Sequence, residues 1–115
     1  MTKYNQDFTM HQGDTKQITI AVVDESDVAK NLTGSTQRWR AYDQDQTTAV
    51  ITKADGDITL VNVDGTNDGL RFTIAAADTA GLLGLYAFEA EVVDTSSNVS
   101  TVARGTVTIR NQLIE

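Results

Sequence analysis

The chain has 115 residues, the size of one ordinary globular domain, and 40% of them are hydrophobic. It contains no cysteine, which excludes disulfides, thiolate chemistry and cysteine-ligated zinc. Its formal net charge of −7 disfavours nucleic acid and anionic membranes as partners, because both select basic proteins. We therefore expect one domain over residues 1–115 that binds neither nucleic acid nor membranes.

The sequence lacks an apolar stretch long enough to cross a bilayer, for which about 18 residues are needed. The segment from Met1 to Asp7 has neither an apolar core nor a small-residue cleavage site, so we predict no secretory signal. We expect the protein to be made in the cytoplasm. If it leaves the cell, we expect it to do so by lysis or within a larger assembly.

Short segments of alternating polar and apolar residues follow one another along the chain, separated by Gly, Asn and Asp clusters. The first predicted strand is short and begins with Phe8 and Met10. The second, from Lys16 to Asp24, is the most clearly defined, because every second residue in it is apolar. Its inward residues are Ile18, Ile20 and Val22.

A third strand is predicted over Thr36 to Tyr42, with Trp39 and Ala41 on the buried face. Arg38 and Arg40 then lie on the outer face, where they form either a cationic contact patch or the polar side of a half-buried strand. Strand alternation alone requires polar residues at these positions, which favours the second interpretation.

Thr48 to Lys53 is expected to form the next strand, and Asp57 to Asp64 the one after it. The buried face of the latter stays open, because its apolar residues fall on both faces. The two registers bury either Ile58 and Leu60 or Val61 and Val63. Leu70 to Ile74 is a further strand whose even-numbered positions are apolar.

Ala75 to Leu83 contains the only segment that we expect to form a helical turn. Leu85 to Asp94 is predicted to be a long strand with Tyr86, Phe88, Ala90 and Val92 on one face. In the last strand one face holds Val99, Thr101, Ala103, Gly105, Val107 and Ile109. Gly105 interrupts that row, which predicts a β-bulge or a close backbone approach. Together these segments predict an all-β protein, a sandwich or a barrel, and of the two we expect an antiparallel β-sandwich of about seven strands.

Reactive residues are few. His11 is the only histidine and has no nucleophile held beside it, so we interpret it as a solvated loop residue. Most Asp residues lie in predicted turns, where their side chains bond nearby backbone N–H groups without a catalytic role. We therefore expect no enzymatic activity and no cofactor.

The turn from Asp64 to Gly69 matches the opening of a calcium-binding loop, with oxygen ligands at alternate residues and glycine at the bend. The final ligand position is Ala75, where such a loop requires a bidentate glutamate, and the flanks look like strands rather than helices. A hairpin turn accounts for the same residues. We accordingly predict no metal site.

Two local patterns resemble the immunoglobulin fold. Trp39 lies in the third predicted strand, where such domains bury a tryptophan, and Asp78 to Tyr86 is similar to their tyrosine corner. The resemblance implies that Phe88 replaces a disulfide cysteine and packs on Trp39. We expect the Phe88 ring also to contact Ile20 or Val22.

The order of motifs resembles small bacteriophage virion proteins with an immunoglobulin-like domain, including the N-terminal domain of siphophage baseplate upper proteins. The stretches that carry the resemblance are 13–15, 31–34, 78–79, 84–86 and 101–109. It implies a non-enzymatic structural protein of the virion, made in the host cytoplasm, that contacts a larger capsid, tail or baseplate protein. It also implies a homo-oligomer in the particle.

Baseplate upper proteins continue into a long C-terminal part, whereas this sequence ends at Glu115. We therefore expect a small free-standing component, namely a capsid decoration protein, a head-fibre base or a tail adaptor.

The alternative hypothesis is a bacterial cell-surface or carbohydrate-binding immunoglobulin-like module. Such a module would need a platform of exposed aromatic rings, and we expect only Tyr4 and Tyr42 to be exposed. As interaction sites we choose two predicted loops, because loops carry recognition on rigid scaffolds. Their residues are Asp43, Gln44, Asp45, Asp64, Asn67 and Asp68.

Overall fold

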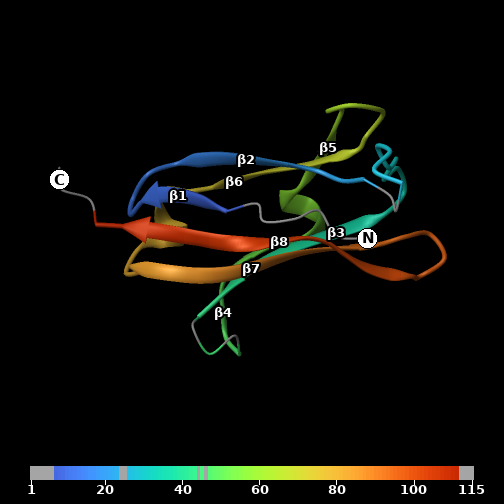
Figure 1. The fold of residues 1–115 in the computed structure, drawn as a ribbon. Helices are drawn as coiled ribbons and strands as arrows, with labels where there is room; N and C mark the ends of the chain where they lie inside the picture. Colours follow the sequence, from blue (N-terminus) through green and yellow to red (C-terminus); the bar gives the residue numbers. More distant parts are fainter. Residues whose placement is uncertain (1–6, 24–25, 44, 46, 112–115) are drawn as a thin grey trace.

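The computed structural model describes residues 7–23, 26–43, 45 and 47–111. In this part of the chain two β-sheets pack face to face (Figure 1). The strands are β1 (Phe8–His11), β2 (Lys16–Ala21), β3 (Thr36–Tyr42), β4 (Ala49–Lys53), β5 (Thr59–Val61), β6 (Gly69–Ile74), β7 (Gly84–Val93) and β8 (Val99–Arg110). Two short 3-10 turns, η1 (Asp55–Asp57) and η2 (Ala76–Thr79), join strands. The second of them is the helical turn expected between Ala75 and Leu83.

The strand order identifies the kind of sandwich. One sheet has the order β1-β8-β7-β3-β4 and the other β2-β6-β5. Neighbouring strands are antiparallel, apart from β1, which runs parallel to β8. This is an immunoglobulin-like arrangement, in which β2, β6 and β5 correspond to strands B, E and D, and β3, β7 and β8 to C, F and G. The predicted fold class is confirmed, with eight strands where about seven were expected.

Trp39 lies at the centre of the core and is 0% exposed. Its ring centroid is 4.8 Å from that of Phe72 in the opposite sheet and 5.4 Å from that of Phe88 in its own sheet. The predicted packing of Phe88 on Trp39 is confirmed. A cluster of aromatic rings therefore stands where antibody domains place their disulfide.

Strand alternation correctly predicted most of the remaining core. Its residues include Met10, Ile18, Ile20, Leu70, Phe72, Ile74, Ala90, Val92, Val107 and Ile109. β2 ends at Ala21, earlier than predicted, and Val22 is buried just beyond that end.

A tyrosine corner fixes the start of β7. The Tyr86 hydroxyl donates to the carbonyl oxygen of Leu83 at 3.0 Å and accepts from the Leu83 N–H at 3.1 Å. Such a bond to backbone a few residues upstream is the feature that the sequence resemblance implied for this segment.

The structure settles the register of the predicted strand at 57–64. Only Thr59–Val61 forms β5, Ile58 is buried before it, and Val63 is exposed after it. The side chains that face the core are therefore Ile58 and Leu60.

The predicted bulge at Gly105 is wrong, since Gly105 pairs in regular register with Phe88. The ladder between β7 and β8 instead pairs Ala90 with Ala103 and Glu91 with Thr101, so that Val102 is the extra residue. A bulge reverses the alternation of the strand on one side of it. Val102 consequently enters the core. The predicted buried face is correct from Ala103 to the end of β8, but it is wrong for the residues before Ala103, where Val99 is exposed.

Candidate functional site

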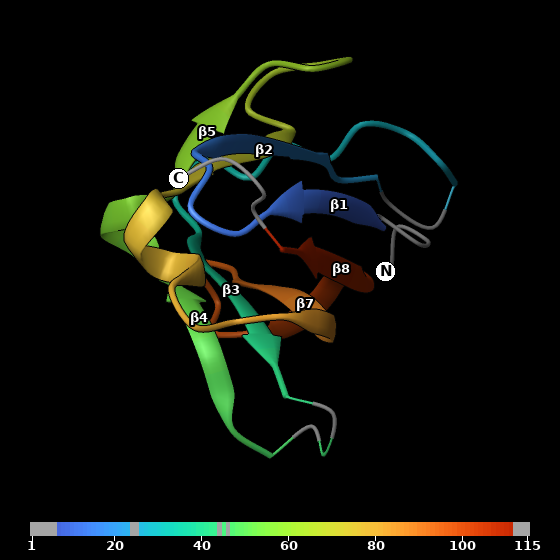
Figure 2. The same ribbon diagram turned by 90° about the vertical axis from the view of Figure 1, so that its left-hand side faces the viewer.

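The two loops that were predicted as interaction sites lie far apart, on opposite sides of the sandwich (Figures 1 and 2). Asp43 and Asp45 belong to the β3–β4 loop, whereas Asp64, Asn67 and Asp68 belong to the β5–β6 loop. Gln44 lies outside the described residues. The structure therefore separates the predicted residues into two groups that cannot contact one small ligand together.

Asp68 shapes its own loop. It is only 1% exposed, and its carboxylate accepts hydrogen bonds from the N–H groups of Val63 at 2.7 Å and Asp64 at 2.9 Å. The bond from Val63 is the main reason that the pKa of Asp68 lies below its ordinary value, and it outweighs the opposing effect of burial. Both oxygens are thus turned toward loop N–H groups rather than toward a partner or a cation.

Asn67 joins two loops. Its backbone lies in the left-handed region at φ 48°, and its side-chain amide donates to the Thr33 hydroxyl at 2.9 Å. The backbone carbonyl oxygen of Asn67 accepts a hydrogen bond from the Leu32 N–H, also at 2.9 Å. The β5–β6 loop and the β2–β3 loop are therefore one hydrogen-bonded unit.

The β7–β8 loop lies at the same end of the molecule. We call the β2–β3, β5–β6 and β7–β8 loops together the loop end. A Cβ atom added to Gly34 would lie 3.1 Å from Cγ2 of Thr95, and one added to Gly65 would lie 3.0 Å from Cβ of Ala29. The loops therefore approach one another closely, and glycine makes the approach possible.

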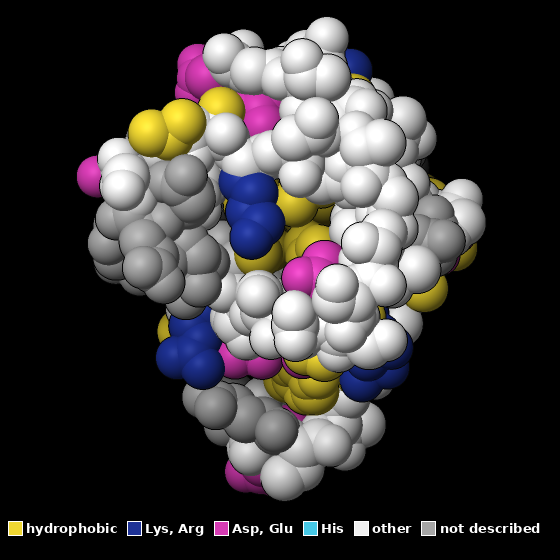
Figure 3. Space-filling model, turned by 90° about the vertical axis from the view of Figure 1, so that its right-hand side faces the viewer, with side chains coloured by type: hydrophobic (Ala, Val, Ile, Leu, Met, Phe, Trp, Pro, Cys, Tyr) yellow, Lys and Arg dark blue, Asp and Glu magenta, His cyan; other side chains and the backbone are white. Residues whose placement is uncertain are grey.

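Each loop of the loop end has an exposed valine in it or directly beside it. Val28 is 57% exposed, Val63 44% and Val99 62%. Figure 3 looks at this end and shows hydrophobic side chains on it, some of them within a central depression bordered by basic and acidic groups. Sequence reasoning missed this surface, because strand alternation assigned Val99 to the buried face and left Val63 undecided.

A second surface covers the outer side of the five-stranded sheet. Arg104 pairs with Glu89 at 2.8 Å and Arg38 with Glu91 at 3.5 Å, so basic and acidic groups alternate there. Arg40 lies opposite Glu89 in the β3–β7 register, and its Nε atom is buried without a hydrogen-bond partner among the described residues. Mixed charge of this kind favours the polar outer side of a strand over a cationic patch.

The same face contains a hollow of about 370 Å³. Its lining residues are Tyr42, Ala87, Phe88, Glu89, Arg104 and Gly105. Tyr42, which we expected to be exposed, is half-buried in its wall. Tyr4 lies outside the described residues.

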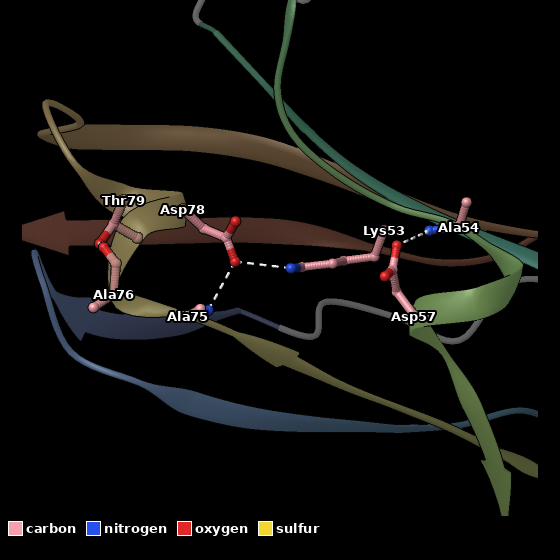
Figure 4. A network of polar contacts seen from close by, with 7 residues as sticks. All are labelled: Lys53, Ala54, Asp57, Ala75, Ala76, Asp78 and Thr79. Carbon is pink, nitrogen blue, oxygen red and sulfur yellow. Dashed lines mark hydrogen bonds and ion pairs between the residues drawn. The ribbon is translucent and has the colours of Figure 1, made fainter.

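The η2 turn is held against β4 by an ion pair (Figure 4). Lys53 Nζ lies 2.8 Å from Oδ2 of Asp78, which also accepts the Ala75 N–H at 2.7 Å. Burial raises the pKa of Asp78, but its hydrogen bonds and the charge of Lys53 outweigh burial, so this pKa lies below its ordinary value. The pair ties β4 to η2 and is structural.

Thr79 continues this network. It is fully buried, and its hydroxyl accepts the Gly13 N–H at 2.9 Å. Two of the stretches that carry the virion resemblance, 13–15 and 78–79, are therefore in contact because of the fold.

His11, which we interpreted as a loop residue, is the last residue of β1. The residue is exposed, and its Nδ1 atom lies 4.0 Å from Oδ2 of Asp14. Among the described residues, no three His, Asp or Glu side chains are grouped so that they could hold a metal ion. The helices of the described part are too short to cross a membrane.

The chain was compared with known proteins by family and by sequence. A scan against protein-family models found no match, and a search of curated proteins also found none.

Proposed function

We propose that this protein is a non-enzymatic structural module that docks on a larger protein through its loop end. The observation that carries the proposal is the exposure of Val28, Val63 and Val99 at three loops that approach one another closely. Single exposed valines are ordinary, but apolar groups collected at one end of a domain mark interaction sites. Burial of their methyl groups against a partner would supply binding free energy.

Hydrogen bonds within and between the loops constrain the described part of the loop end. Asp68 closes the β5–β6 loop, and Asn67 joins it to the β2–β3 loop. In the β7–β8 loop, Asp94 accepts the N–H groups of Ser96 and Asn98, each at 2.9 Å. A surface that is already ordered loses little conformational entropy on binding, which favours docking.

The resemblance to phage virion proteins supplies the setting of this proposal. In that setting the partner is a capsid, tail or baseplate protein, and the module is a capsid decoration protein, a head-fibre base or an adaptor. The net charge of −7 suits a protein that is present in many copies, because mutual repulsion limits indiscriminate association.

Particle incorporation tests the proposal. Gradient-purified particles should contain the wild-type chain at a fixed copy number, measured by quantitative mass spectrometry. The triple variant Val28→Ser, Val63→Ser and Val99→Ser should be lost from them. The matched control is Leu83→Ser with Leu85→Ser, which removes two exposed apolar side chains away from the loop end. Absence of the wild-type chain from particles, or equal incorporation of both variants, would refute the proposal.

A carbohydrate-binding module is the second candidate, and the hollow at Tyr42 is the observation that favours it. An aromatic ring beside the Glu89 carboxylate and the Arg104 guanidinium offers a sugar both an apolar surface and partners for its hydroxyls. A glycan array with the wild type and with Tyr42→Ala tests this function. Binding that disappears in the variant would support it, and the loop-end variant should retain that binding.

A further inference from the structure

In the described part of the chain, four strands lie at sheet edges, and three of them have a feature that disfavours further pairing. β1 has 4 residues and β5 has 3, so both are short. β4 contains a bulge, because Ala41 pairs with Ile51 whereas Tyr42 pairs with Ala49, which leaves Val50 extra. Short strands and bulges are established protections of a sheet edge. The chain contains no proline that could add to them.

β2 differs from the other three edges. It has 6 residues and pairs with β6 in unbroken register from Lys16↔Ile74 to Ala21↔Gly69. Among the described residues, β6 is the only strand that pairs with it. Within this part of the chain, the opposite side of β2 is therefore a regular and unprotected edge.

The ladder shows which backbone groups face outward. The N–H of Val22 donates to the carbonyl oxygen of Asp68 at 2.8 Å, one residue beyond Ala21↔Gly69, the last pair of the β2–β6 register. In an antiparallel ladder, hydrogen-bonded pairs occur at every second residue. Lys16, Ile18 and Ile20 therefore bond to β6. The residues with outward N–H and C=O groups are Gln17, Thr19 and Ala21.

We propose that this edge pairs with the same edge of a second copy, antiparallel, about a twofold axis at Thr19. Thr19 then lies opposite Thr19 of the second copy, and Gln17 lies opposite Ala21. Every outward residue of β2 becomes part of a hydrogen-bonded pair, in which two residues exchange two bonds. The two three-stranded sheets join into one continuous sheet.

The alternation of side chains along β2 favours this register over its neighbours. A slip by a single residue would place Ile18 opposite a residue whose side chain points away from the core, which is unfavourable. A slip by two residues keeps the faces but leaves one outward residue of each copy without a partner. The register centred on Thr19 is therefore the one that satisfies the most backbone groups.

The charge of the edge also fits a second copy. The chain carries a net charge of −7, yet β2 contains no acidic residue and only one charged residue, Lys16. The side chains that meet across the axis, Thr19 with Thr19, are neutral and exposed, and threonine pairs favourably across strands. Two copies of an acidic protein can approach here with little repulsion.

The pairing predicts where the loop ends lie. β2 runs toward the loop end, and antiparallel pairing points the two loop ends in opposite directions. Such a dimer would connect two partner proteins, a consequence that rests on the proposed docking function. The dimer itself does not depend on that function.

Disulfide trapping gives a direct test, because the wild-type chain has no cysteine. Opposed Cα atoms in a hydrogen-bonded antiparallel pair are about 5.5 Å apart, which lies within the range that a disulfide can span. Thr19→Cys should form a disulfide-linked dimer under mild oxidation on a non-reducing gel. The control Thr73→Cys, also exposed but on β6, should stay monomeric. Equal cross-linking of both variants would overturn the proposal.

Molar mass in solution provides the second test, by size-exclusion chromatography with light scattering. The wild type should move from 12.4 kDa toward twice that mass as its concentration rises. Thr19→Glu should remain a monomer, because two carboxylates would meet at the axis. The same substitution should leave the monomer folded, because the Thr19 side chain is exposed. Thr73→Glu is the control and should dimerise like the wild type.

Two results of the molar-mass measurement would also overturn the edge pairing. One is a wild type that stays at 12.4 kDa at millimolar concentration. The other is a dimer that persists in Thr19→Glu, since its interface would then lie elsewhere. The loop-end variant, which retains β2, should dimerise like the wild type whether or not the loop end docks, so failure of the docking function and failure of the dimer are distinguishable.

Discussion

Trp39 of β3 and Phe72 of β6 belong to different sheets, and their ring centroids lie 4.8 Å apart at an interplanar angle of 38°. Phe88 also packs on Trp39, at 5.4 Å, and Phe8 lies 5.7 Å from Phe88. Rings therefore connect the two sheets in a chain without cysteine. Tilted aromatic pairs at these separations add attraction beyond the burial of apolar area.

Truncation of one ring should show how much the aromatic contacts between the sheets contribute to the free energy of unfolding. We expect Phe72→Ala to lower the free energy of unfolding by about 3–5 kcal/mol, because it removes a buried ring and leaves a cavity beside Trp39. Chemical denaturation followed by the fluorescence of Trp39, the only tryptophan, measures it. The neighbouring exposed residue is the control, since Thr73→Ala should change stability by about 0.5 kcal/mol or less. Similar losses in both variants would contradict this role.

The loss of folding stability at acidic pH should depend on Asp78. Its pKa in the folded protein lies below its ordinary value, so folding favours the ionised form. The resulting stabilisation is present above the unfolded pKa and is lost as the pH falls through the folded pKa. We therefore expect the wild type to lose stability below about pH 4, with Asp68 and Asp94, whose pKa values are also lowered, contributing in the same direction.

Asp78→Asn tests that assignment. At neutral pH the substitution should cost about 1–3 kcal/mol, because Lys53 loses its ionic partner in a half-buried position. Below the folded pKa of Asp78 the wild type and the variant should converge. Urea titrations at several pH values measure both quantities, and an equal difference at every pH would show that the charge of Asp78 is not responsible.

The bulge at Val102 can be tested by threonine substitution at two positions of β8. Val102→Thr should cost about 1–3 kcal/mol, because it places a hydroxyl in the apolar core. Val99→Thr should change stability by about 0.5 kcal/mol or less, since Val99 is exposed. Regular alternation along β8 would give the reverse order, so the ranking of the two melting temperatures decides between the registers.

Two glycines with nearly equal φ angles allow the cost of backbone strain to be distinguished from the effect of the contact between loops. Gly34 has φ +83° and Gly81 has φ +80°, but only at Gly34 would a Cβ meet another atom, Cγ2 of Thr95 at 3.1 Å. Alanine at either position should cost about 1–2 kcal/mol for the left-handed conformation. Gly34→Ala should additionally push the β2–β3 loop from the β7–β8 loop and weaken docking by the loop end. Equal effects on docking would show that this contact does not shape the surface.

The amino-acid sequence determined the strands and most of the core. Alternation within β2, β3, β6 and β7 is a local property, because successive side chains of any strand point to opposite faces. It was therefore sufficient to predict that Trp39 is buried and that Arg38 points outward. The turn and tyrosine corner before β7 could also be predicted, since their residues are close together in the chain.

The tertiary structure decided whatever depends on distant segments. The bulge at Val102 arises from the pairing of β7 with β8, and its effect on the exposure of Val99 cannot be seen in the alternation itself. Likewise, Asp68 looks like any turn aspartate until its loop folds around the carboxylate. The gathering of Val28, Val63 and Val99 at one end, and the position of β2 at a sheet edge among the described residues, follow from which strands become neighbours. Strand order is a property of the whole chain, so no single segment contains it.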